Sequence, residues 1–243
     1  MVLKRAVRRG FDRIGMDLER WPHSGTVEEL LGGILQVYDV EGVVDVGANV
    51  GRWAAAVRRL GFDGPLVSLE PVESAYVELC RRSAADPSWT AMRVAAGERC
   101  GEATIHVARS TSTSSLLAVN DYYRNRYEGS HPVGDETVEL VTLDSIRDRL
   151  PDGRRLLLKV DTQGYDMKVL DGATELLTRV AALQTELSLQ ANYHGVTNSW
   201  TDVIDRMRGL GFSIAGLFHI ERDEVLRQTE MDGVFVRTEL AGG

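Results

Sequence analysis

The stretch VVDVGANVGRW, residues 43–53, has the pattern of a buried strand that leads through a glycine turn into a helix. Residues 43–46 are apolar apart from Asp45, and residues 52–60 carry apolar side chains at helical spacing. Glycine lets the backbone pass close to a ligand, and such turns lie at the carboxyl edge of open α/β sheets, where ligands bind. The stretch predicts a doubly wound α/β fold with a ligand at this turn, although a purely structural turn can have the same residues.

The turn lacks the G-x-G-x-x-G spacing with which dinucleotide sites hold a pyrophosphate. The next apolar run, residues 65–70, ends in Glu70. An acidic side chain there can accept hydrogen bonds from ribose hydroxyls; the alternative role is a helix N-cap, for which Glu is poorly suited. Both features predict an adenosyl cofactor without phosphates, and S-adenosylmethionine is the candidate. The cofactor-binding residues predicted from this pattern are Asp45, Gly47, Ala48, Asn49, Gly51 and Glu70.

Short apolar runs alternate with helix-like stretches along most of the chain. This alternation is typical of a mostly parallel sheet with helices on both faces, and near-continuous apolar runs fit strands that are buried on both sides. The runs cover residues 42–47, 65–70, 89–95, 155–161, 180–188, 212–218 and 233–237. The helix-like stretches cover residues 52–60, 72–84, 145–150, 166–178 and 199–208.

We predict an N-terminal helical extension over residues 1–40, followed by one domain over residues 41–243. Residues 1–21 are basic and amphipathic, which favours a helix that caps the fold, with contact to an anionic lipid or ligand as the alternative. Residues 101–142 interrupt the alternation with two strand-like stretches around a polar, tyrosine-rich segment. This pattern predicts a β-hairpin insertion with a lid, whose Tyr and Arg side chains suit a sugar or a protein interface equally well.

The 243 residues carry a formal net charge of -8, which argues against a nucleic-acid substrate. The two cysteines, Cys80 and Cys100, form no C-x-x-C pair, which favours a reduced compartment. We find no apolar run long enough to span a membrane and no secretory signal, so we expect a cytoplasmic protein. A homo-oligomer is possible through the N-terminal helix or the insertion.

Several short motifs occur in a characteristic order along the chain. They are DVGANVG (45–51), LEP (69–71), TSTSSL (111–116), VTLDSI (141–146), LLLKVDTQGYDMKVLDGA (156–173), LQTELS (183–188), NYHG (192–195), GF (211–212) and MDGVFVR (231–237). With these motifs the chain resembles, between residues 40 and 238, the FkbM family of S-adenosylmethionine-dependent methyltransferases. The resemblance implies a class I (Rossmann-like) methyltransferase fold, with seven strands of which the last is antiparallel, and O-methylation of sugars, polyketides or other natural products. We also place Pro71, Ala96, Ser115 and Asp161 at the cofactor. One departure is Gln163, where many relatives have Glu.

An alcohol must lose a proton when it accepts a methyl group, so a base or a metal ion is expected beside it. Asp161 and Glu186 end two apolar runs and are the predicted catalytic carboxylates, with His194 as a further candidate base. Asp161, Glu186 and Asp232 together could bind Mg²⁺. Structural roles compete at each position: an N-cap at Asp161, an ion pair with Lys159 at Glu186, an ordinary loop at His194 and a turn at Asp232.

The sequence thus predicts an enzyme that methylates a hydroxyl of a sugar or glycosylated metabolite, with a small-molecule or oligosaccharide substrate. Three alternatives remain open. The acceptor can be a polyketide, a lipid or a phenol; the chain can be a scaffold that binds S-adenosylmethionine without catalysis; or it can be a dehydrogenase, against which the missing dinucleotide motif counts.

Overall fold

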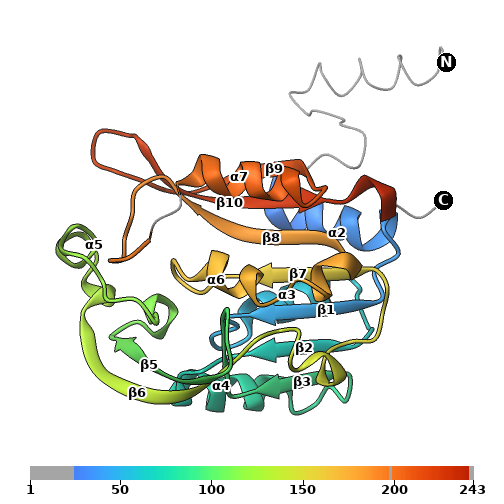
Figure 1. Cartoon of the computed structure of the whole chain (residues 1–243), viewed down its shortest axis with the longest axis horizontal. Helices are drawn as coiled ribbons and strands as arrows, with labels where there is room; N and C mark the ends of the chain where they lie inside the picture. Colours follow the sequence, from blue (N-terminus) through green and yellow to red (C-terminus); the bar gives the residue numbers. More distant parts are fainter. Residues whose placement is uncertain (1–24, 197–198, 241–243) are drawn as a thin grey trace, which may run out of the picture.

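The computed structural model describes residues 25–196 and 199–240, and a seven-stranded sheet forms its centre (Figure 1). The basic helix predicted for residues 1–21 lies outside the described residues. From one edge to the other, the strands are β3 (Trp89–Met92), β2 (Leu66–Leu69), β1 (Gly42–Val46), β7 (Leu156–Val160), β8 (Val180–Ser188), β10 (Gln228–Val236) and β9 (Ser213–Arg222).

Strand β10, the last strand in the sequence, is antiparallel to the two strands beside it in the sheet. Strand β10 is antiparallel to both β8 and β9, whereas β1 pairs in parallel with β2 and β7. The side chains of β1 alternate between two hydrophobic clusters, with Val44 and Val46 in one and Val43 in the other. The prediction of a doubly wound, mostly parallel sheet with an antiparallel last strand is confirmed.

Helices cover both faces of this sheet. Apolar residues of α2 and α3 pack into the cluster on one face, and those of α6 and α7 pack into the cluster on the other. These faces are apolar because each helix repeats apolar side chains every three or four residues. The helices are α2 (Val27–Val37), α3 (Arg52–Arg59), α4 (Glu73–Ser83), α6 (Asp166–Asp171) and α7 (Trp200–Gly209).

The insertion forms a small second sheet beyond the carboxyl ends of the central strands (Figure 1). Strands β5 (Gly101–Ala108) and β6 (Pro132–Val141) pair antiparallel, and β4 (Ala95–Ala96) pairs with β6 in parallel. The short helix α5 (Asp121–Arg126) lies in the connection between β5 and β6. The predicted β-hairpin therefore forms, and its connection projects over the edge where a ligand was expected.

Two predicted helices are shorter in the structure. Residues 145–150 form only a 3₁₀ turn, because the stretch is too short to nucleate a helix and Pro151 follows it. The helix predicted for residues 166–178 ends at Asp171, next to Gly172. The 3₁₀ turns are Thr111–Thr113, Glu128–Ser130, Arg147–Arg149, Leu176–Arg179 and Thr238–Leu240.

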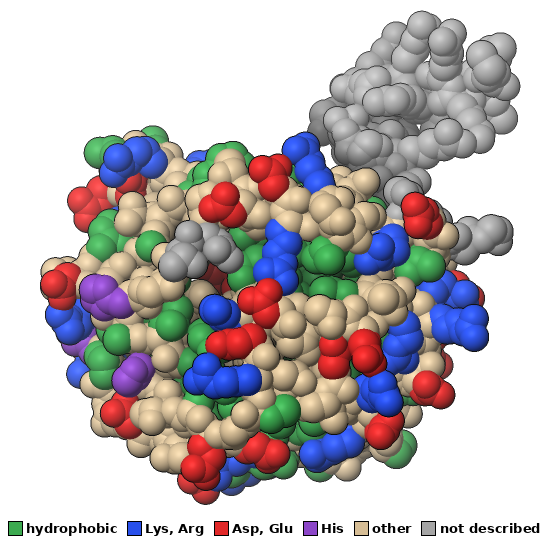
Figure 2. Space-filling view, viewed as in Figure 1, with side chains coloured by type: hydrophobic (Ala, Val, Ile, Leu, Met, Phe, Trp, Pro, Cys, Tyr) green, Lys and Arg blue, Asp and Glu red, His purple; other side chains and the backbone are tan. Residues whose placement is uncertain are grey.

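Basic and acidic side chains are interspersed on the face drawn in Figure 2, with no broad area of one sign on its described part. In the part of the chain that the structure describes, none of the helices has the length and apolar character needed to cross a membrane.

Candidate functional site

The glycine turn after β1 is held between the two neighbouring strands. The N–H groups of Gly47 and Ala48 donate to the carbonyl of Leu69, at 3.0 and 2.9 Å. Gly47 has a φ of 74°, and a Cβ atom there would lie 1.9 Å from the carbonyl oxygen of Asp161. Only glycine fits this close approach. The turn therefore brings β1, β2 and β7 together at one point of the carboxyl edge.

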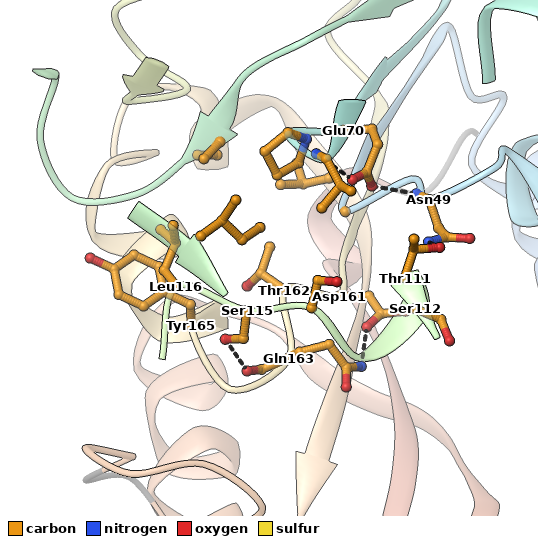
Figure 3. Close-up of a pocket in the computed structure, with 18 of the residues that line it drawn as sticks. Asn49, Glu70, Thr111, Ser112, Ser115, Leu116, Asp161, Thr162, Gln163 and Tyr165 are labelled. Atoms are coloured by element: carbon orange, nitrogen blue, oxygen red, sulfur yellow. Dashed lines mark hydrogen bonds between the residues drawn. The ribbon is translucent and has the colours of Figure 1, made fainter. Parts of the chain in front are cut away.

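Glu70 follows β2 and is only 4% exposed. Its Oε2 atom accepts a hydrogen bond from the N–H of Asn49 at 2.7 Å, and its Oε1 atom accepts one from the N–H of Val72 at 2.8 Å. Burial raises the pKa of Glu70 to about 7, although these two hydrogen bonds oppose the shift. The carboxylate is thereby fixed beside the turn (Figure 3).

A first cavity of about 610 Å³ lies between the glycine turn, Glu70 and the insertion (Figure 3). Val94, Ile105 and Leu116 supply apolar surface. None of the described residues that line it is Lys, Arg or His, so the cavity offers no cation to a phosphate group. Seven of the predicted cofactor residues line it: Gly47, Asn49, Glu70, Pro71, Ala96, Ser115 and Asp161.

A second, larger cavity of about 1520 Å³ adjoins the first. The two share Gly47, Asn49, Ser112, Asp161 and Gln163, so these residues border both cavities. Side chains from the carboxyl ends of β7, β8 and β9 and from the beginning of the antiparallel β10 form much of its lining, and α3 and the insertion add aromatic rings. Other lining residues include Trp53, Tyr123, Tyr127, Lys159, Gln184, Glu186, Glu221, Glu230 and Asp232.

Lys159 lies between the carboxylates of Asp45 and Asp161. Its Nζ atom lies 3.1 Å from Oδ2 of Asp161 and 3.5 Å from Oδ1 of Asp45, and 5.8 Å from the centre of the Trp53 ring. Burial alone would lower the pKa of Lys159, but the charges of Asp161 and Asp45 outweigh it and raise that pKa. Lys159 is therefore a cation that orients Asp161, and the expected pairing with Glu186 does not occur.

Gln163 separates the two predicted catalytic carboxylates. Its Nε2 atom donates to Oδ1 of Asp161 at 2.9 Å and to Oε2 of Glu186 at 3.2 Å. Its Oε1 atom accepts from the hydroxyl of Tyr193 at 2.9 Å, and its backbone oxygen accepts from Oγ of Ser115 at 2.8 Å. The residue has a φ of 55°, which is unusual for a side chain of this size and marks a conformation imposed by its surroundings.

Two glutamates in the second cavity are destabilised as anions. Burial and the charge of Glu230 raise the pKa of Glu186 well above its usual value. Burial and the charge of Glu221 raise the pKa of Glu230 to about 7. Such shifts suit groups that exchange protons near neutral pH.

Four other predicted site residues lie outside the lining of the first cavity. His194 is exposed and lines neither cavity. The two preceding residues, Asn192 and Tyr193, are the ones whose side chains are buried. Asp45 is fully buried against Ser68 and Lys159, and thus lies below the site without facing it. Gly51 packs under Leu79 and Trp89. Ala48 lines the second cavity and not the first.

Tyr193, the neighbour of His194, is the residue that sequence reasoning missed. It is 5% exposed and packs edge-on against Tyr123 with ring centres 5.8 Å apart. Its hydroxyl has one hydrogen, which two acceptors share: Oε1 of Gln163 at 2.9 Å and the carbonyl of Thr113 at 3.0 Å. An aromatic ring among polar neighbours in N-Y-H-G could have indicated burial, but not these partners.

The carboxylates do not form a metal site. Gln163 lies between Asp161 and Glu186, and Nε2 of Gln184 donates to Asp232 at 3.0 Å. Among residues 25–196 and 199–240, no group of three or more His, Cys, Asp or Glu side chains is arranged to hold a metal ion. The expectation of Mg²⁺ has no support here.

The strand order, the antiparallel last strand and the glycine turn at the carboxyl edge define a class I methyltransferase fold. The family model described as "Methyltransferase FkbM domain" matches residues 45–214. The chain therefore belongs to the FkbM methyltransferase family and is an S-adenosylmethionine-dependent methyltransferase. A search of curated protein sequences found no match.

Solved structures with a similar chain path have low sequence identity. An rRNA methylase from Streptococcus thermophilus is 11% identical, with a TM-score of 0.48 over 90% of this chain and 98% of that one. Fibrillarin from Aeropyrum pernix, bound to S-adenosylmethionine, is 11% identical, with a TM-score of 0.47 over 85% and 72%. A precorrin-6y C5,15-methyltransferase from Geobacter metallireducens is 11% identical, with a TM-score of 0.46 over 86% of each chain. The strand order and the family match, not these likenesses, define the class.

Proposed function

We propose that this protein transfers a methyl group from S-adenosylmethionine to a hydroxyl of a sugar or glycosylated metabolite. One observation carries the proposal: two adjoining cavities share Asp161 and Gln163 in their linings. The smaller cavity suits the cofactor, and the larger one suits an acceptor. A methyl donor and a hydroxyl bound where the two cavities adjoin would be held next to each other, which favours reaction.

The residues of the first cavity fit the cofactor. The carboxylate of Glu70 keeps lone pairs that can accept from two ribose hydroxyls, and Val94, Ala96 and Leu116 offer apolar surface to an adenine ring. The described lining of this cavity contains no Lys, Arg or His side chain, which suits a ligand without phosphate groups. When bound, S-adenosylmethionine supplies a methyl group that is activated by its sulfonium.

The residues of the second cavity fit a sugar. Trp53, Tyr123 and Tyr127 offer aromatic surface to the apolar faces of a pyranose, and carboxylates accept hydrogen bonds from its hydroxyls. Asp161 lies next to both cavities and orients the hydroxyl. Glu186 is the base in this proposal, because burial and the charge of Glu230 raise its pKa and so make its carboxylate more basic.

The proposal is tested by incubating the full chain with methyl-labelled S-adenosylmethionine and a panel of short oligosaccharides, followed by mass spectrometry and NMR of the products. We expect a labelled methoxyl group on a sugar ring. If only a phenol, a polyketide or a lipid accepts the labelled methyl group, that class of acceptor would replace the sugar in the proposal. Cofactor binding without turnover on any acceptor would favour the scaffold.

A further inference from the structure

The second cavity contains more carboxylates than cations. Its lining includes two basic side chains, Arg52 and Lys159. Lys159 is engaged by Asp45 and Asp161, and Arg52 is exposed. A lining with this imbalance has a strongly negative potential, which walls of low dielectric constant intensify. The carboxylates are those of Glu28, Asp161, Glu186, Glu221, Glu230 and Asp232.

Most of these carboxylates have partners within the protein. Arg126 lies 3.2 Å from Glu221, and Gln184 donates to Asp232. Glu230 differs, because it is only 7% exposed and yet lines the cavity. Its Oε1 atom accepts from Nδ2 of Asn192, and no donor among the described residues contacts its Oε2 atom. The side chain of Glu230 is thus nearly buried as a whole, while its Oε2 atom stays accessible and has no hydrogen-bond donor among the described residues.

Glu186 adds to this deficit of positive charge. Its partners are neutral: Oγ of Ser188 at 3.1 Å and Nε2 of Gln163 at 3.2 Å. Glu186 and Glu230 lie close enough for the charge of Glu230 to raise the pKa of Glu186. Buried carboxylates without a counter-ion are costly, whereas a cation between them would favour both anions.

We propose that the acceptor carries a protonated amino group, as an amino sugar does, and that this group binds at Glu230, close to Glu186; the proposal rests on the function proposed above. Tyr123 and Tyr127 stack with ring centres 5.9 Å apart and line the same cavity, so their ring faces can contact the ammonium or the sugar. The same charges repel acceptors with carboxylate or phosphate groups, which gives discrimination as well as affinity.

The test measures binding without turnover. The full chain, saturated with S-adenosylhomocysteine, is titrated at neutral pH with the methyl glycosides of glucosamine, glucose and glucuronic acid, and NMR gives each Kd. We expect the glucosaminide to bind roughly 10-fold more tightly than the glucoside, and the glucuronide most weakly. Added salt should reduce the preference.

The variant Glu230→Gln keeps the shape of the side chain and removes its charge. It should lower the preference for the glucosaminide by about 5- to 10-fold and leave the Kd of the glucoside within about 2-fold. Glu224→Gln makes the same charge change on the exposed β9–β10 hairpin, outside the cavity lining, and should have little effect. An unchanged Kd for S-adenosylhomocysteine verifies that each variant is folded.

Equal affinity for the three glycosides, tighter binding of the glucuronide, or an unchanged preference in Glu230→Gln would overturn the inference. Its failure is separate from that of the proposed function. Methylated sugars without a preference for amines would leave the proposed function standing. If the protein prefers the amine but transfers no methyl group to any hydroxyl, the amine-binding site would be supported and the proposed O-methylation would be wrong.

Discussion

Asp161 takes part in three arrangements at once. Its side chain is 38% exposed, it forms an ion pair with Lys159, and it accepts a hydrogen bond from Gln163. It also lines both cavities. A carboxylate that is fixed from two sides can orient a hydroxyl without spending binding energy on its own ordering.

Asp161→Asn should therefore lower kcat by about 10²- to 10⁴-fold while the Kd of S-adenosylhomocysteine changes by less than about 3-fold. The amide keeps the size of the side chain but cannot serve as an anion beside Lys159. Turnover with the identified acceptor and calorimetry with S-adenosylhomocysteine give the two numbers. Asp205→Asn on the exposed side of α7 is the control. Equal losses of turnover and cofactor affinity would assign Asp161 to the cofactor alone.

The sequence predicted the carboxylates of the site better than their neighbours. Asp161 and Glu186 follow from their places at the ends of two apolar runs, because strand ends meet at one edge. Gln163 and Tyr193 contact residues that are far away in the sequence, such as Glu186 and Thr113, and no local pattern predicts such long-range contacts. The ordinary pKa of histidine favoured His194 as a base, but its side chain is exposed, whereas that of the preceding residue, Tyr193, is buried.

Among the elements, the turn after β1 has the strictest geometry. Gly47→Ala should destabilise the protein by at least about 3 kcal/mol, because backbone strain and a clash with the carbonyl of Asp161 add together. Gly61→Ala is the matched control: Gly61 also has a positive φ, 94°, but nothing lies within 4 Å of its added Cβ. It should cost about 1 kcal/mol. Urea unfolding measures both, and similar losses would contradict the clash.

The side chain of Arg126 connects helix α5 to strand β9. Arg126 forms an ion pair with Glu221 and donates to the carbonyl of Arg222. Arg126→Gln should raise the KM for the acceptor about 5-fold and leave the Kd of S-adenosylhomocysteine unchanged, because the attachment borders only the second cavity. Arg124→Gln on the same helix, whose ion pair is local to α5, is the control. An equal effect of both substitutions would rule out the attachment.

The central strands were predictable because each is a run of apolar residues between polar or glycine-rich segments. The glycine turn marks β1 as the strand beside the ligand, but no local stretch of sequence contains the order of the strands. Helix lengths were less predictable. Residues 145–150 have helical spacing, but they are too few to offset the cost of starting a helix, and packing decides their path.

For the whole molecule, the buried carboxyl groups make stability depend on pH. The pKa of Glu230 is about 7 in the folded protein, against about 4.3 in an unfolded chain. Between these values the folded state holds more protons, so stability falls as the pH rises. Glu70 and Asp166, whose pKa values are also raised to about 7, act in the same direction.

Glu230→Gln should reduce the loss of unfolding free energy between about pH 5 and pH 8 by about 1–3 kcal/mol, because the amide resembles the protonated acid. Urea unfolding at several pH values measures this, with Glu224→Gln as the exposed control. A variant that loses as much stability as the parent protein over this range would show that Glu230 titrates normally.

The insertion belongs to both cavities: Thr111 and Ser115 line the first, and Tyr123 and Tyr127 line the second. A cofactor that binds against residues 111–115 should therefore also fix the positions of Tyr123 and Tyr127, which follow in the same insertion. The enzyme should then follow a compulsory sequence, in which the methyl donor enters first and its demethylated product departs last. Initial rates would display this as inhibition by S-adenosylhomocysteine that is competitive against the donor and noncompetitive against the sugar.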